Sequence, residues 1–254
     1  MRLPDFIIGG APRSGTSWLY QVLDMHPEIH MAKPIKPEPK FFLIDKLYEK
    51  GIEYYAKTWF PDSGIHKIYG EKTTNYLEAA TVAKRIYKHL PNIKLIFILR
   101  DPVERAFSNY LWSTNNKMEK EDFETALLLE DKREKELPEN LRYSRPHAYF
   151  SRGLYVDLLE PYFCLFPRKQ ILCLKFEDIE ESADIFIERV HRFIGVTPRR
   201  EDGNTLGKVN DVSREDSLTM STRVRDKLRK LYDEPNRRLA LLLGPGFKVW
   251  ESHE

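Results

Sequence analysis

Glycine, hydroxyl and guanidinium residues directly follow a short apolar run near the start of the chain, in DFIIGGAPRSGTSWL (residues 5–19). A turn that leads into a helix presents backbone N–H groups and the positive end of the helix dipole to an anion. Gly10, Gly15 and Ser17 fit the phosphate-binding pattern G-x-x-x-x-G-K-[ST], but Thr16 stands where that pattern has lysine. The stretch therefore predicts a phosphate ligand that does not require the lysine of nucleotide triphosphatases.

Side chains inside this loop indicate a second charged group on the ligand. The hydroxyls of Ser14, Thr16 and Ser17 are hydrogen-bond donors for a phosphate, and Gly15 lets the backbone approach it. Arg13 can form paired hydrogen bonds to an adjacent anion. An ordinary strand–turn–helix connection is the alternative explanation of the same residues.

A second candidate anion site follows the strongest strand pattern, KLIFIL at residues 94–99. Arg100 comes directly after this run, Pro102 favours the start of a helix, and Ser108 lies about two turns further along it. A guanidinium at a helix N-terminus is a strong site for a dianion. Taken alone, Arg100 is better explained by a surface ion pair with Asp101 or Glu104, and Ser108 by a small residue of a helix.

The elements that must position these residues alternate between strands and helices. Apolar runs predict strands at residues 6–8, 67–70, 94–99 and 170–174. Helical spacing predicts helices at residues 15–25, 77–90, 103–112, 153–166, 182–193 and 223–243, the last broken at Pro235. The alternation predicts an α/β, P-loop-like three-layer fold with a central, mostly parallel sheet flanked by helices. Ligands of such sheets bind at the carboxyl ends of strands, so the loop and the Arg100 corner are candidates for one shared site.

A chain of 254 residues predicts a single domain over residues 1–254. Within it, residues 113–145 form a charged insertion, which we interpret as a solvated surface helix or a substrate-side lid. The 41 basic and 39 acidic residues leave a net charge of +2, which excludes non-specific nucleic-acid binding. Two cysteines, Cys164 and Cys173, favour a reducing cytoplasm. No apolar run approaches the roughly 18 residues of a membrane helix or resembles a signal peptide, so we expect no membrane partner.

Several stretches resemble the sulfotransferases that use 3′-phosphoadenosine 5′-phosphosulfate (PAPS). PRSGTSWL (residues 12–19) resembles their 5′-phosphosulfate loop, and LRDPVERAFSNY (residues 99–110) resembles their 3′-phosphate motif. EKTTNY (residues 71–76) and EPKFF (residues 38–42) are similar to EKTPAY and EVHFF of the heparan sulfate branch. The resemblance extends over most of the chain, and the paired phosphate motifs are its most specific part.

The resemblance implies transfer of a sulfuryl group from PAPS, without a metal, to a hydroxyl of a small metabolite or sugar. The product of the co-substrate is 3′-phosphoadenosine 5′-phosphate (PAP). Arg13, Ser14, Gly15, Thr16 and Ser17 would bind its 5′ end.

The resemblance also assigns residues elsewhere in the chain to the nucleotide. Arg100 and Ser108 would bind the 3′-phosphate. Tyr155, in an RGxY stretch, and Lys208, in a polar loop, would contact the nucleotide.

Sulfuryl transfer requires a base for the acceptor hydroxyl and cations where negative charge develops. The resemblance offers Glu38 as the base and Lys72 as a contact of the sulfonate or acceptor. Arg13 would stabilise charge rather than donate a proton. His147 is an alternative base. Thr74 replaces the proline of EKTPAY, from which we expect only a minor change of the turn.

Two rival functions fit parts of the same sequence. A P-loop small-molecule kinase would use Asp101 as its magnesium-site carboxylate, but the missing loop lysine disfavours it. A nucleotide-binding module without catalysis would keep both phosphate motifs. The acceptor atom, oxygen or nitrogen, and the oligomeric state are open at this level.

Overall fold

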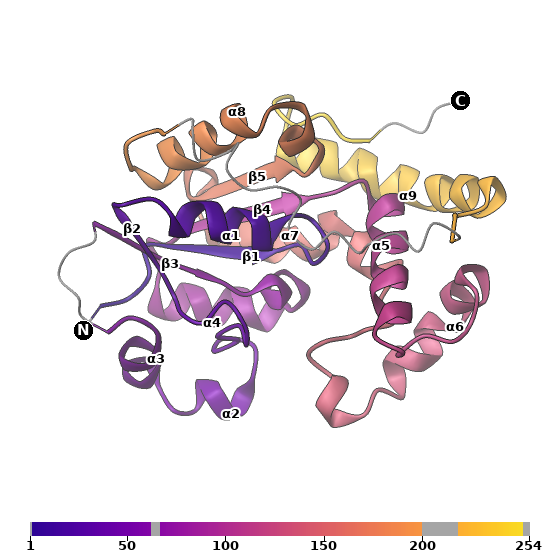
Figure 1. Ribbon diagram of the computed structural model, residues 1–254, viewed down its shortest axis with the longest axis horizontal. Helices are drawn as coiled ribbons and strands as arrows, with labels where there is room; N and C mark the ends of the chain where they lie inside the picture. The colour runs from indigo at the N-terminus through magenta and orange to yellow at the C-terminus, as the bar shows by residue number, and fades with distance from the viewer. Residues whose placement is uncertain (1, 62–66, 200–217, 251–254) are drawn as a thin grey trace. The chain divides into compact units, whose positions relative to one another are not determined.

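Five parallel strands form the sheet from which the candidate residues extend. The computed structural model describes residues 2–61, 67–199 and 218–250, and Figure 1 shows its elements. The strands are β1 (Phe6–Gly10), β2 (Ile29–Met31), β3 (Ile68–Lys72), β4 (Lys94–Leu99) and β5 (Ile171–Lys175). They lie in the order β2-β3-β1-β4-β5, and every pairing is parallel. The predicted α/β fold with a central parallel sheet is therefore confirmed.

The helices match most of the expected segments. They are α1 (Thr16–Asp24), α2 (Asp45–Tyr48), α3 (Ile52–Trp59), α4 (Ala80–His89), α5 (Pro102–Asn115), α6 (Phe123–Lys135), α7 (Tyr155–Leu165), α8 (Glu177–Ile194) and α9 (Thr222–Leu243). Short 3₁₀ turns are η1 (Thr74–Glu78), η2 (Glu139–Leu141), η3 (Ser151–Gly153) and η4 (Arg168–Gln170). None of the helices in the described ranges is long and apolar enough to cross a membrane.

Apolar side chains on both faces of the sheet explain why its strands are buried. Helices α1 and α8 cover one face and α4 covers the other (Figure 1). Ile8, Ile96 and Leu174 belong to the core cluster under α1 and α8. On the opposite face the ring of Phe97 lies 4.9 Å from that of Tyr162. Side chains alternate along a strand, so one short apolar run fills two separate cores.

Contacts between residues divide the chain into two compact units. The first comprises residues 1–99 and 161–210, and the second comprises residues 100–160 and 211–254. The sheet belongs to the first unit. In the second, helices α5, α6 and α9 contribute to a cluster of buried side chains: Val103, Ala106, Tyr110, Phe123, Ala126, Tyr149, Val224, Leu228 and Tyr232.

Three elements and one helix differ from the sequence-based expectations. Strand β2 and helices α2 and α3 were not predicted. The expected break at Pro235 is wrong, because α9 continues through this residue to Leu243. Val224, Leu228 and Tyr232, at helical spacing before the proline, are buried in one cluster and hold the helix in place.

Candidate active site

The loop between β1 and α1 has the backbone geometry of an anion cradle. Its start is anchored to β4, because the Ala11 N–H donates to the Ile98 carbonyl at 2.8 Å. Arg13 and Gly15 have positive φ angles of 68° and 80°. Gly15 precedes the first turn of α1, which has no side-chain cap and no acidic residue. The positive end of α1 is therefore not neutralised by a side chain of its own N-terminus.

Two details of the loop suit a bound anion. A Cβ atom on Gly15 would lie 3.0 Å from Phe176 and 3.1 Å from Ile179, so this position is crowded as well as left-handed. The Ser14 side chain is fully buried, and its Oγ has no hydrogen-bond partner among the described residues. A buried polar atom of this kind normally has a partner, and a ligand oxygen beside the loop would supply one.

Lys72 joins the loop to the predicted base. It is the last residue of β3, and the parallel register places it opposite Ile8 of β1. Its Nζ lies 2.7 Å from Glu38 Oε1 and donates to Ser17 Oγ at 3.3 Å. The side chains of Lys72 and Glu38 are only 2% and 12% exposed. Three predicted residues that lie far apart in the sequence thus meet at the N-terminus of α1.

Thr74 has a larger consequence than the minor change of turn expected from the sequence. Its backbone N–H donates to Glu38 Oε2 at 3.2 Å, and its hydroxyl lies 3.3 Å from both carboxylate oxygens. A proline at this position would have no N–H to donate. The sequence signal was visible as a departure from the EKTPAY motif, but its structural meaning depended on where Glu38 lies.

Within the second unit, the Tyr155 side chain forms hydrogen bonds with the main chain of Arg100. The Tyr155 hydroxyl donates to the Arg100 carbonyl at 2.8 Å and accepts from the Arg100 N–H at 3.4 Å. Ser108 lies two turns along α5, as the sequence predicted. Lys208, the remaining predicted nucleotide contact, lies outside the described residues.

Asp101 is occupied as the N-cap of α5. Its Oδ1 accepts from the Val103 N–H at 2.8 Å and from the Glu104 N–H at 3.4 Å. Burial raises the pKa of Asp101, and these hydrogen bonds oppose that effect. The carboxylate therefore stabilises a helix end, which weakens its assignment as a magnesium ligand. No cluster of three or more His, Cys, Asp or Glu side chains with metal-binding geometry occurs in the described ranges.

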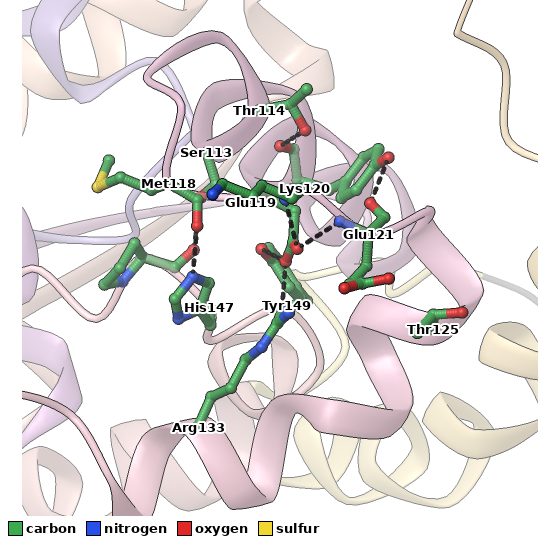
Figure 2. Close-up of polar contacts among 12 residues, drawn as sticks. Ser113, Thr114, Met118, Glu119, Lys120, Glu121, Thr125, Arg133, His147 and Tyr149 are labelled. Atoms are coloured by element: carbon green, nitrogen blue, oxygen red, sulfur yellow. Dashed lines mark hydrogen bonds and ion pairs between the residues drawn. The ribbon is translucent and has the colours of Figure 1, made fainter.

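One ring nitrogen of His147 contacts the main chain, and the other is buried. Its Nε2 lies 2.9 Å from the Met118 carbonyl, and its Nδ1 is buried without a partner among the described residues (Figure 2). If Nε2 donates to that carbonyl, the basic nitrogen is the buried Nδ1. The choice between Glu38 and His147 as the base stays a prediction.

The charged insertion at residues 113–145 contains a packed carboxylate. Glu119 accepts from the Tyr149 hydroxyl at 2.7 Å and pairs with Arg133 at 2.5 Å (Figure 2). Burial acts to raise the pKa of Glu119, but hydrogen bonds from Tyr149, Arg133 and nearby backbone N–H groups outweigh it and lower that pKa. These contacts hold the insertion together, and its role as a lid stays a prediction.

Comparisons with known proteins give the family of this chain. The family described as "Sulfotransferase domain" matches residues 3–217. Heparan sulfate glucosamine 3-O-sulfotransferase 5 of Mus musculus is 30% identical over 200 residues, which is 78% of this chain and 55% of that protein. The membrane-associated sulfotransferase kil1 of Dictyostelium discoideum is 41% identical over 113 residues, covering 44% of this chain and 23% of that protein. The chain thus spans about half or less of these relatives.

Solved structures show the same fold. A sulfotransferase from Alicyclobacillus acidocaldarius superposes with a TM-score of 0.78 at 26% identity, covering 96% of both chains. Mouse sulfotransferase SULT7A1, solved with PAP, has a TM-score of 0.57 at 16% identity, covering 93% of this chain and 85% of that one, and supports the fold alone. The domain match covers most of the sequence and includes the loop, Glu38, Lys72 and Arg100. The chain therefore belongs to the sulfotransferase family.

Proposed function

We propose that this chain transfers a sulfuryl group from PAPS to a hydroxyl group of a small metabolite or sugar. The observation that carries the proposal is the Glu38–Lys72 pair, 2.7 Å apart, with Lys72 also bonded to Ser17 at the N-terminus of α1. A base, a cation and an anion cradle thus lie together. This combination fits abstraction of a proton next to a leaving phosphate.

The loop residues fit the 5′ end of PAPS. Ser14 would gain a partner for its buried hydroxyl, and the uncapped first turn of α1 would supply N–H groups from Thr16 and Ser17. Arg13 would add a guanidinium beside this group. On the second unit, Arg100 and Ser108 would bind the 3′-phosphate.

Glu38 would act as the base that removes the proton from the acceptor oxygen. Thr74 and Lys72 hold its carboxylate in position through hydrogen bonds and the ion pair. PAPS, when bound, supplies the sulfuryl group, whose bond to the 5′-phosphate oxygen breaks as the acceptor oxygen bonds to sulfur. Lys72 and Arg13 would stabilise the negative charge that develops during this exchange.

The acceptor and the cellular setting extend this proposal. The names of the heparan sulfate relatives support a saccharide acceptor, and the name of the 3-O-sulfotransferase supports a hydroxyl as its reacting group. Three further features stay predictions from the sequence: a single domain over residues 1–254, a cytoplasmic location and independence from a metal. The use of Asp101 as a helix cap disfavours the rival kinase function.

Calorimetric titration with PAP in the absence of magnesium tests the nucleotide site. We expect micromolar binding, weaker binding of 5′-AMP, and a loss of about 10- to 100-fold for PAP in Arg100→Ala, since a charged hydrogen bond contributes about 1.5–3 kcal/mol. Arg142, an exposed arginine of the same unit, gives the control variant Arg142→Ala. If ATP binds only with magnesium and PAP does not bind, the rival kinase function would be favoured over sulfuryl transfer.

Transfer itself needs a separate assay. Sulfur-35 from labelled PAPS is followed into heparan sulfate and into a panel of simple hydroxyl compounds. Tight PAP binding without transfer to any of them would favour a nucleotide-binding module.

A further inference from the structure

Glu71 is a buried carboxyl beside the catalytic lysine that the proposed mechanism does not use. It precedes Lys72 on β3, so its side chain points to the opposite face of the sheet. The residue is 0% exposed. Its Oε2 accepts from the Tyr55 hydroxyl at 2.7 Å, and its Oε1 has no hydrogen-bond partner among the described residues.

The surroundings of Glu71 favour its neutral form. The groups that act on it are the phenols of Tyr55 on α3 and Tyr76 on η1, the Thr73 hydroxyl, and the carboxylate of Glu38. Burial raises the pKa of Glu71 to about 8, while the hydroxyls oppose this effect and Glu38 adds to it. Both phenols have pKa values well above 10, because they are buried, and stay neutral over the same range.

The same phenols hold the segment that carries Glu38. The ring of Phe41 stacks on Tyr55 with centroids 4.6 Å apart. The ring of Phe42 packs edge-on against Tyr55 and Tyr76 at 5.3 and 5.8 Å, and the Phe42 N–H donates to the Tyr76 hydroxyl at 3.2 Å.

A second attachment of this segment lies closer to the base. The Lys40 N–H donates to Thr73 Oγ1 at 3.2 Å, and Lys40 is two residues from Glu38. Glu38 therefore lies on a short segment fixed by hydroxyl groups that also face Glu71.

We propose that Glu71 is a positioning residue whose carboxyl orients Tyr55 and Tyr76 and thereby fixes Glu38 against Lys72. The proposal rests on the proposed function of Glu38 as the base. Ionisation of Glu71 would place a second negative charge near Glu38 and an unpaired charge among aromatic rings. Transfer should then fall as Glu71 loses its proton.

The kinetics of the wild type, two Glu71 variants and one control variant over about pH 6 to 9.5 test this role. PAPS is the donor and heparan sulfate is the probe acceptor. We expect wild-type kcat to fall above pH 8, the value near which Glu71 ionises. Glu71→Leu should lower kcat about 10-fold at every pH, with the KM for PAPS unchanged, because the Tyr55 hydroxyl loses its acceptor. Glu71→Gln keeps a neutral acceptor, so it should rescue neutral-pH activity relative to Glu71→Leu and abolish the alkaline fall.

Glu53, an exposed acid on α3, supplies the control Glu53→Gln, which should keep the wild-type rate and pH profile. An alkaline fall that persists in Glu71→Gln, or a Glu71→Leu variant with wild-type kcat, would overturn the proposal.

A carboxyl NMR titration with carbon-13-labelled glutamate is independent of the acceptor. The resonance absent from Glu71→Gln should titrate near pH 8 in the wild type, and the resonance absent from Glu38→Gln should shift at the same pH. This outcome supports the coupling between Glu71 and Glu38 even if the wild type transfers no sulfuryl group to heparan sulfate. The absence of transfer would count against the proposed function alone. Glu71 ionising near its ordinary value of 4.5, or an unresponsive Glu38 resonance, would refute the coupling.

Discussion

Replacing Lys72 by methionine, Glu38 by glutamine, and then both together would measure the ion pair at the centre of the site. The pair is 2.7 Å long, and its side chains are 2% and 12% exposed. Breaking a buried ion pair by removing one partner costs roughly 3–5 kcal/mol. Glu38 keeps its Thr74 hydrogen bonds and some solvent, so we expect Lys72→Met to cost about 3 kcal/mol of unfolding free energy.

Glu38→Gln should be less destabilised than Lys72→Met, and the double variant should be less destabilised than the sum of the two single effects. Glutamine at position 38 can still accept from Lys72 and Thr74, so Glu38→Gln should cost about 1–2 kcal/mol. The double variant no longer contains an unpaired charge. We therefore expect a coupling of about 2 kcal/mol between positions 38 and 72.

Urea unfolding of the four proteins at neutral pH, followed by circular dichroism and fluorescence, gives this coupling. Arg192 and Glu188 on α8 form an i,i+4 pair in the same unit, in which the arginine side chain is 71% exposed and the glutamate side chain is 16% exposed. They supply a comparison cycle of Arg192→Met and Glu188→Gln. That control coupling should be below about 0.5 kcal/mol.

Two results would refute this account of the site. Effects at positions 38 and 72 that add within about 0.5 kcal/mol would show that the pair is not formed in solution. Glu38→Gln should lose sulfuryl transfer while it keeps PAP affinity within about 3-fold, because the base contacts the acceptor rather than the nucleotide. Full transfer by Glu38→Gln would exclude this residue as the base.

Gly15→Ala should weaken PAP binding at least about 10-fold and destabilise the fold by about 1–3 kcal/mol. The reason is that Gly15 has a φ angle of +80° and that an added Cβ would lie 3.0 Å from the Phe176 side chain. Gly51→Ala has a similar φ of +83° without neighbours within 4 Å, so equal loss of PAP affinity in both variants would contradict the role of the loop. His191 supplies an acid-stability prediction, since burial lowers its pKa from 6.5 to about 4. The stability from neutral His191 is present above pH 6.5 and is lost as pH falls to about 4. His191→Asn keeps an acceptor for the Arg199 N–H. Between pH 6.5 and pH 4, urea unfolding should show the wild type losing about 2–3 kcal/mol more unfolding free energy than this variant. Parallel changes of unfolding free energy with pH in the two proteins would exclude the effect.

Local sequence patterns predicted most of the sheet because its strands are continuous apolar runs. Residues 94–99 are entirely apolar after the first and form β4 over the predicted range. Strand β2, by contrast, has three residues with a histidine in the middle, so it has no distinctive pattern. It exists because it pairs with β3, which is a contact that local spacing does not encode.

Helix ends show the same division. The Asp101-Pro102 pair marks the start of α5 through a cap and a favoured first residue, both of which are local. Pro235 suggested a break in α9 for equally local reasons. Buried contacts of Val224, Leu228 and Tyr232 anchor the helix before this proline, and it continues to Leu243.

The sequence by itself determined the chemical groups available: a glycine loop with hydroxyls and Arg13, an arginine after β4, and a carboxylate between prolines. Only the tertiary structure decided which of them meet. Lys72 reaches Ser17 because β3 pairs with β1 in a parallel register, and a shift of one residue would send it to the face where Glu71 lies. Glu38 reaches Lys72 because aromatic packing and Thr74 fix its segment. Register and packing join residues far apart in the chain, so residue spacing alone cannot determine these contacts.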